Sequence, residues 1–143
     1  MTNREYLKQW REDRNLSSCN YRVFFANVIE ELLEPLYHKD DIPRMVKEIM
    51  DIYYPEECNL KENEVVDAMT DIRVFAENET ENMGYNSDLT MLEVIREISS
   101  RVQDPKQKID WAMNGVQGKW LKDKEQPKDT MYKADFSKAK LNV

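Results

Sequence analysis

Two groups of carboxylates at helical spacing are the residues of this sequence that could do chemistry. In the second group along the chain, Glu64, Asp67 and Asp71 occupy positions i, i+3 and i+7. On a helix that advances roughly 100° per residue, these positions fall within an arc of about 60°. Their oxygen atoms can therefore face one site, and hard cations such as Mg²⁺ prefer oxygen ligands.

The neighbours of this acidic group predict where it lies on its helix. By the same arithmetic, the carboxylates border the apolar face and do not lie opposite it. We therefore expect half-buried carboxylates, where like charges are costly without protons, basic partners or a metal. The apolar residues that define this face are Val65, Ala68, Met69 and Ile72.

The earlier acidic group consists of Glu30, Glu31 and Glu34, which fit within about 100° of arc. Its apolar neighbours lie largely on the far side of the helix, so an inward position is less favoured here. Two such helices around a shared cleft could hold Mg²⁺ against a nucleoside triphosphate. A metal-bound water is easier to deprotonate, and a second carboxylate could accept its proton.

A solvent-exposed surface is the alternative explanation for both groups. The chain contains 28 Asp and Glu residues. In a helical protein of this composition, acidic residues often recur at i, i+3 and i+4 on exposed faces. Spacing alone does not decide between a metal site and an ordinary acidic surface.

Length and composition favour one helical domain. The chain has 143 residues, with 3 Gly and 5 Pro, which is little material for a turn-rich β fold. The net charge of -7 argues against nucleic acid as a partner, because that binding neutralises many phosphates with Lys and Arg. A triphosphate ligand would likewise need bridging cations, so the nucleotide hypothesis requires Mg²⁺.

Several other kinds of chemistry have no residues to support them. Cys19 and Cys58 form no CxxC pair, and the single histidine, His38, leaves no zinc cluster or Ser-His-Asp set. We find no EF-hand loop for calcium. The chain shows neither the pattern of a signal peptide nor an apolar run of membrane-spanning length. We therefore expect a cytoplasmic protein with no membrane partner.

Capping residues and apolar spacing predict an all-α fold, a helical bundle of about five to six helices. The helices are expected at about 3–12, from a cap at Ser17 or Ser18 to about Pro35, at 41–54, from about Asn59 to Gly84, after Asn86, and from Asp104 through Met113. We expect residues 1–117 to form the domain. Residues 118–143 are rich in lysine, and form either an arm that packs on the domain or on a partner subunit, or a disordered tail.

Both acidic groups match the order of motifs in a known superfamily. Glu30-Glu31-Leu32-Leu33-Glu34 reads as an EExxE helix, and Glu64-Val65-Val66-Asp67 as a later ExxD helix. Here the sequence resembles the all-α NTP pyrophosphatases, which include MazG, dimeric dUTPases and phosphoribosyl-ATP pyrophosphohydrolase. Residues 66–76 and 83–85 look like the second motif helix of phage-type and MazG-like members, and residues 93–101 and 118–122 resemble their phosphate-side segments. The resemblance spans roughly Tyr21 to Lys122.

This resemblance implies an activity, a metal and an assembly. The activity is Mg²⁺-dependent cleavage between the α and β phosphates of a nucleoside triphosphate or deoxynucleoside triphosphate, with Mn²⁺ as a possible substitute. A homodimer or homotetramer is implied, because members build their sites at subunit interfaces. Glu31 and Glu34 would position or deprotonate the attacking water. The implied metal ligands are Glu30, Glu31, Glu34, Glu64, Asp67 and Asp71. The helix-like stretch from Asp41 to Tyr54 departs from the family, so details of its substrate pocket do not transfer.

Further residues are candidates for binding the nucleotide. Arg101, Lys119 and Lys122 could neutralise phosphates, although each could equally be a solvated surface cation. Trp120 or Tyr85 could stack on a base, but packing is the common role of such residues. Asn78, about two turns beyond Asp71, could bind a ribose or base, or simply lie on the surface.

A second class of function is open. The chain could be a non-catalytic helical interaction protein that is encoded by a phage and located in the host cytoplasm. It would then bind a host protein or sequester a nucleotide without cleaving it. Turnover of nucleoside triphosphates distinguishes the two classes.

Overall fold

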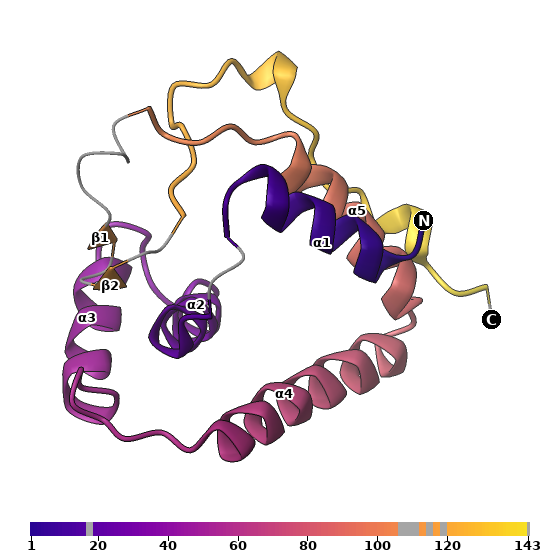
Figure 1. Cartoon of the computed structure of the whole chain (residues 1–143). Coiled ribbons are helices and arrows are strands. Elements are labelled where there is room, and N and C mark those ends of the chain that lie inside the picture. Colours follow the sequence, from indigo (N-terminus) through magenta and orange to yellow (C-terminus); the bar gives the residue numbers. More distant parts are fainter. Residues whose placement is uncertain (17–18, 106–111, 114–115, 118–119, 143) are drawn as a thin grey trace. The chain divides into compact units, whose positions relative to one another are not determined.

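Five α-helices make up most of the structure, which is a computed structural model describing residues 1–16, 19–105, 112–113, 116–117 and 120–142 (Figure 1). This helical content confirms the predicted all-α class, while the MazG-like arrangement and the oligomer stay predictions. The helices are α1 (Asn3–Asp13), α2 (Tyr21–Leu33), α3 (Ile42–Tyr53), α4 (Glu62–Asn82) and α5 (Ser87–Ser99). Two short 3₁₀ helices follow, η1 (Lys128–Thr130) and η2 (Phe136–Ala139).

The predicted sixth helix, from Asp104 through Met113, is wrong at its C-terminal end, while residues 106–111 lie outside the described residues. Strands β1 (Ala112–Met113) and β2 (Val116–Gln117) pair antiparallel, with Met113 opposite Val116. The sequence between them is Asn-Gly, the pair of residues that most strongly favours a two-residue β-hairpin. This turn signal outweighs the apolar spacing that suggested a helix. Ile109 and Trp111, expected in that helix, lie outside the described residues.

The start of α2 also differs from the prediction. The N-cap is Asn20, whose side-chain Oδ1 accepts a hydrogen bond from the backbone N–H of Val23 at 3.2 Å. Asparagine is as effective a cap as serine, because both place a short acceptor beside the first free N–H groups. Ser17 and Ser18, the predicted caps, lie outside the described residues.

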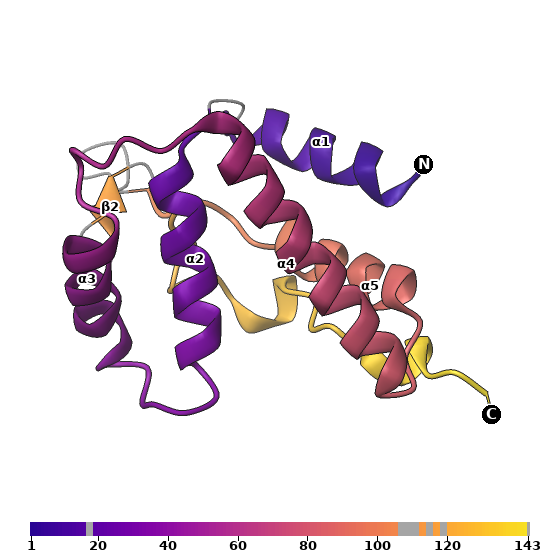
Figure 2. The same ribbon diagram turned by 90° about the horizontal axis from the view of Figure 1, so that it is seen from below.

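The chain forms two compact units, and the first of them contains α2 and α3. This α2–α3 unit comprises Ser18–Leu60 and Asp104–Leu121. Helices α2 and α3 pack side by side (Figure 2), and their buried side chains are Phe25, Ala26, Ile42, Val46 and Met50. The ring of Phe25 stacks on Tyr54 with 4.4 Å between the ring centroids. Both helices were predicted from the sequence, although the start of α2 differs.

The second unit contains α1, α4 and α5 and comprises Met1–Ser17, Lys61–Gln103 and Lys122–Val143. Helix α1 packs along α5 (Figure 1). The buried apolar side chains of this unit are Val65, Ile95 and Ala139. The predicted domain boundary after residue 117 stays a prediction. No helix within the described ranges is long and apolar enough to cross a membrane.

A C-terminal strap, which we define as residues 126–141, runs along the whole of α5. Near the end of α5, the backbone N–H of Tyr132 donates to Ser100 Oγ at 2.9 Å. Near its start, the N–H of Asn86 donates to the carbonyl of Ala139 at 2.8 Å. The strap therefore belongs to the core of the α1–α4–α5 unit and supplies the buried Ala139.

Candidate functional site

Helix α4 places the second acidic group on a single face. It is regular from Glu62 to Asn82, so Glu64, Asp67 and Asp71 lie within about 60° of arc. Asn78 falls within the same arc, although it is two turns further along. The structure therefore brings one predicted substrate residue onto the face of three predicted metal ligands.

The carboxylates of this face are exposed, whereas the sequence predicted a half-buried position. Their apolar neighbours Ala68, Met69 and Ile72 are half-buried, as expected beside them. The difference arises because Val65 is the one buried residue of this long helix. Helix α4 thus presents its acidic face to solvent.

Glu64, Asp67 and Asp71 differ from many other exposed acids of the chain. Within the part of the chain that the structure describes, no lysine or arginine forms an ion pair with them. Like charges at i, i+3 and i+4 oppose helix formation by about 0.2–0.5 kcal/mol per pair. Four other helical acids have a basic partner one turn earlier: Lys8 with Glu12 at 3.8 Å, Arg44 with Glu48 at 3.2 Å, Lys47 with Asp51 at 2.7 Å and Arg73 with Glu77 at 3.1 Å.

Helix α4 alone does not complete a metal shell. Among the described residues, no three His, Cys, Asp or Glu side chains lie close enough to hold one ion. Glu64 and Asp71 are separated by about 10 Å along the helix axis, at 1.5 Å per residue. Two adjacent carboxylates with water and phosphate oxygens would nevertheless suit Mg²⁺, which keeps several waters and takes few protein ligands. The remaining ligands must come from another element.

The first acidic group lies at the C-terminal end of α2, in the α2–α3 unit. Glu30 is half-buried, while Glu31 and Glu34 are exposed. Glu34 is the C-cap residue, and its N–H donates to the carbonyl of Glu30 at 3.0 Å. The two acidic groups thus belong to different units of the chain.

The predicted phosphate and base contacts are spread over both units. Trp120 is half-buried in the α2–α3 unit. Lys122 is exposed in the other unit, where its backbone forms an isolated antiparallel β-bridge with Gln103. Arg101 follows α5 and donates from Nη1 to Met131 Sδ at 2.9 Å. Lys119 lies outside the described residues.

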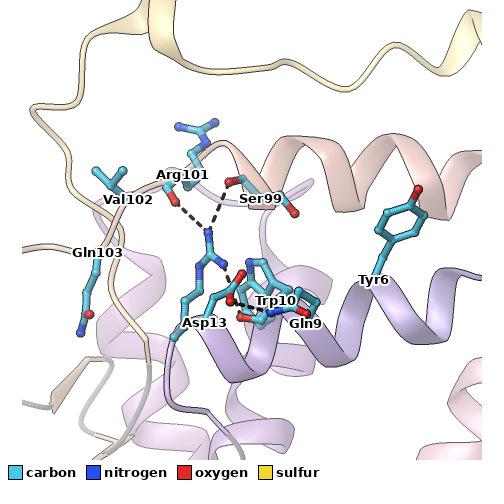
Figure 3. Close-up of a pocket in the computed structure, with 9 residues that line it drawn as sticks. Tyr6, Gln9, Trp10, Asp13, Ser99, Arg101, Val102 and Gln103 are labelled. Atoms are coloured by element: carbon cyan, nitrogen blue, oxygen red, sulfur yellow. Dashed lines mark hydrogen bonds between the residues drawn. The ribbon is translucent and has the colours of Figure 1, made fainter. Parts of the chain in front are cut away.

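A cavity of about 400 Å³ lies between α1 and the segment that follows α5 (Figure 3). Arg14 lines it and donates to the carbonyl oxygens of Ile98 at 3.3 Å and Arg101 at 3.0 Å. Its guanidinium also lies 5.0 Å from the ring centroid of Trp10. Burial lowers the pKa of Arg14 from its usual value. This arginine caps the carbonyl end of α5, so its role is structural.

Among the described residues of the predicted site, Arg101 alone lies in the wall of this cavity. Its carbonyl faces the interior, but its guanidinium points away from Trp10 and Asp13 (Figure 3). The cavity therefore does not assemble the predicted nucleotide contacts.

Glu93 is a charged residue whose importance sequence reasoning missed. Its side chain is 2% exposed and accepts hydrogen bonds from the Tyr132 hydroxyl, from the Asp135 N–H at 3.0 Å and from Arg96 Nη1 at 2.8 Å. The hydrogen bond from Tyr132 is the main reason that the pKa of Glu93 is lowered from its usual value. Two of the three donors are about forty residues away, so no local pattern could reveal this network. It fastens the strap to α5.

Comparison with known proteins gives no further assignment. No family model matches the chain, and neither the curated proteins nor the solved structures contain a match.

Proposed function

We propose that this protein is a Mg²⁺-dependent nucleoside triphosphate pyrophosphohydrolase. The observation that carries the proposal is the face of α4, where Glu64, Asp67 and Asp71 lie exposed without basic partners. Carboxylates that repel one another and have no cation are suited to receive one. The order of the EExxE and ExxD motifs then favours a phosphoanhydride as the substrate.

The proposed reaction cleaves the bond between the α and β phosphates. A water oxygen adds to the α-phosphorus while the bond to the bridging oxygen breaks, and pyrophosphate departs with that electron pair. Bound Mg²⁺ would neutralise phosphate charge and lower the pKa of the water. Glu31 or Glu34 would orient this water and accept its proton. The other product is the nucleoside monophosphate.

An oligomer is part of the same proposal. Large apolar side chains are exposed beside the first acidic group, at Leu32 and Leu36. Exposed apolar residues of this kind commonly mark an interaction surface. In a homodimer or homotetramer, this surface would be covered by a neighbouring subunit.

Pyrophosphate release tests the proposal. The purified protein is incubated with Mg²⁺ and a panel of canonical and modified nucleoside triphosphates, and pyrophosphate and monophosphate are both quantified. We expect turnover of at least one substrate, with a loss of at least about a hundredfold in Asp67→Asn and Glu31→Gln. Glu77→Gln is the matched control, because Glu77 is an acid of α4 that pairs with Arg73 on another arc.

A non-catalytic interaction protein is the second candidate. The observation that favours it is the exposure of Val66 and Val74 on α4, beyond what a metal site needs. This function predicts no turnover with any nucleotide. It is consistent with tight binding of a nucleoside triphosphate, measured by calorimetry, without product formation.

A further inference from the structure

The C-terminal strap is attached to its unit mainly by hydrogen bonds and buries little apolar surface. Among the strap residues, all of which the structure describes, Ala139 is the one buried apolar side chain. Phe136 and Leu141 are 44% and 39% exposed. Segments that bury few apolar groups open locally at a lower free energy than the whole protein. We therefore expect the strap to open before the helices unfold.

The buried carboxylate of Glu93 makes this opening a single event. It accepts hydrogen bonds from the Tyr132 hydroxyl and from the Asp135 N–H, so it joins two positions of the strap. Losing either donor alone would leave a buried charge partly unsatisfied, which is costly. Once the strap has left, water reaches Glu93, and Arg96 of the same helix stays as its partner. Helix α5 therefore remains folded while the strap detaches as one unit.

One contact of the strap holds an arginine on a poor partner. Arg101 donates from Nη1 to Met131 Sδ at 2.9 Å. No carboxylate in the described part of the chain forms an ion pair with Arg101. A thioether sulfur is a weak acceptor, whereas a guanidinium binds phosphate through strong, charge-assisted hydrogen bonds. A phosphate group would therefore compete well with Met131 for this side chain.

We propose that the strap is an autoinhibitory latch, and that its opening transfers Arg101 from the Met131 sulfur to a polyphosphate anion. The proposal rests on the proposed function, in which Arg101 is a candidate phosphate contact, and adds the regulation of that contact. A ligand that binds the open state more tightly than the closed state raises the population of the open state. Polyphosphate thus opens the latch that Met131 helps to hold closed.

Hydrogen exchange of the full chain, followed by NMR with and without pyrophosphate and in the absence of Mg²⁺, tests the latch. Without pyrophosphate, three strap N–H groups should share one protection factor, at least about tenfold smaller than that of the α5 interior. These are the N–H groups of Tyr132, Asp135 and Leu141, each of which is hydrogen-bonded outside the strap. Saturating pyrophosphate should speed their exchange at least about tenfold. Sodium chloride of equal ionic strength should not.

Two substitutions with matched controls identify the residues of the latch. Arg101→Met should remove the response to pyrophosphate, while Arg4→Met, at an exposed arginine of α1, should keep it. Met131→Leu keeps the apolar volume but removes the sulfur acceptor. It should tighten pyrophosphate binding about twofold to tenfold, the effect of one lost hydrogen bond. Met83→Leu, at an exposed methionine, should leave that affinity unchanged.

Three results would overturn the latch. They are equal protection of the strap and α5 amides, no acceleration by pyrophosphate in the wild type, and an undiminished response in Arg101→Met. If pyrophosphate opens the strap of a wild type that turns over no nucleotide, the proposed function falls and the anion-sensitive latch is retained. If the wild type turns over nucleotide but its strap does not respond to pyrophosphate, the latch alone is rejected.

Discussion

Tyr132 donates its hydroxyl hydrogen bond to Glu93, a carboxylate that is 2% exposed in the middle of α5. Lys138 in turn donates to the Tyr132 oxygen at 3.1 Å, and its ammonium lies 5.5 Å from the centroid of that ring. A buried carboxylate is tolerated when donors satisfy it, and here most of them come from the C-terminal strap. The strap and α5 therefore depend on one another.

Removing the hydroxyl should loosen the strap. We expect Tyr132→Phe to lower the Tm by about 2–4 °C, the effect of one lost hydrogen bond in a chain of this size. Hydrogen exchange should become faster at the N–H of Asp135, which also bonds to Glu93. Tyr37→Phe, at an exposed tyrosine, is the control and should change neither quantity. An unchanged exchange rate in Tyr132→Phe would show that the network does not hold the strap.

Acid should weaken the same attachment. The pKa of Glu93 is lowered in the folded protein, chiefly by the hydrogen bond from Tyr132, with Asp135, Lys138 and Arg96 acting in the same direction. The ionised Glu93 carboxylate therefore stabilises the folded protein fully at pH values above its ordinary pKa of 4.5, and this stabilisation is lost as the pH falls below that value. Urea unfolding at a series of pH values measures the free energy of unfolding. We expect this free energy to fall more steeply with decreasing pH in the wild type than in Glu93→Gln. Identical slopes would contradict this assignment.

We expect the acidic face of α4 to lower the stability of the metal-free protein and to contribute to Mg²⁺ binding. Asp71→Asn removes a like-charge pair with Asp67, so we expect the metal-free protein to become more stable by about 0.2–0.5 kcal/mol. Mg²⁺ with a non-hydrolysable nucleotide should raise the Tm of the wild type, because ligands stabilise the state that binds them. That increase should be smaller in Asp71→Asn. Differential scanning calorimetry with and without Mg²⁺ measures both effects, and an equal increase in the two proteins would exclude Asp71 as a ligand.

Arg14 should be structural. Its guanidinium donates to backbone carbonyls at the end of α5, so Arg14→Met would leave these acceptors without their charged donor. We expect a loss of about 2 kcal/mol in the free energy of unfolding, measured with urea, and no change in KM. Arg11→Met, at an exposed arginine of the same helix, is the control. A changed KM in Arg14→Met with unchanged stability would assign the cavity to ligand binding.

Local patterns predicted much of this fold. Apolar spacing and helix starts located α1, α3, α4 and α5, because each helix encodes its own period. The error at β1, which the prediction placed at the end of a helix, arose where a short apolar series is followed by the dipeptide Asn-Gly.

The candidate site was predictable only where one helix carries it. The arc shared by Glu64, Asp67 and Asp71 follows from helix geometry, so the sequence located it. Their exposure depends on how few residues α4 buries, which is a tertiary property. The link between Glu93 and Tyr132 joins residues 39 positions apart, beyond the reach of any local pattern.

Product analysis of Asp67→Asn beside Glu77→Gln tests the central claim most directly. Both substitutions remove one negative charge from α4, but only Asp67 lies on the face without basic partners. The proposed function predicts Mg²⁺-dependent release of pyrophosphate and nucleoside monophosphate by the wild type and Glu77→Gln, with a loss of at least about a hundredfold in Asp67→Asn. Equal turnover in all three proteins, or none in the wild type with any nucleotide, would contradict it.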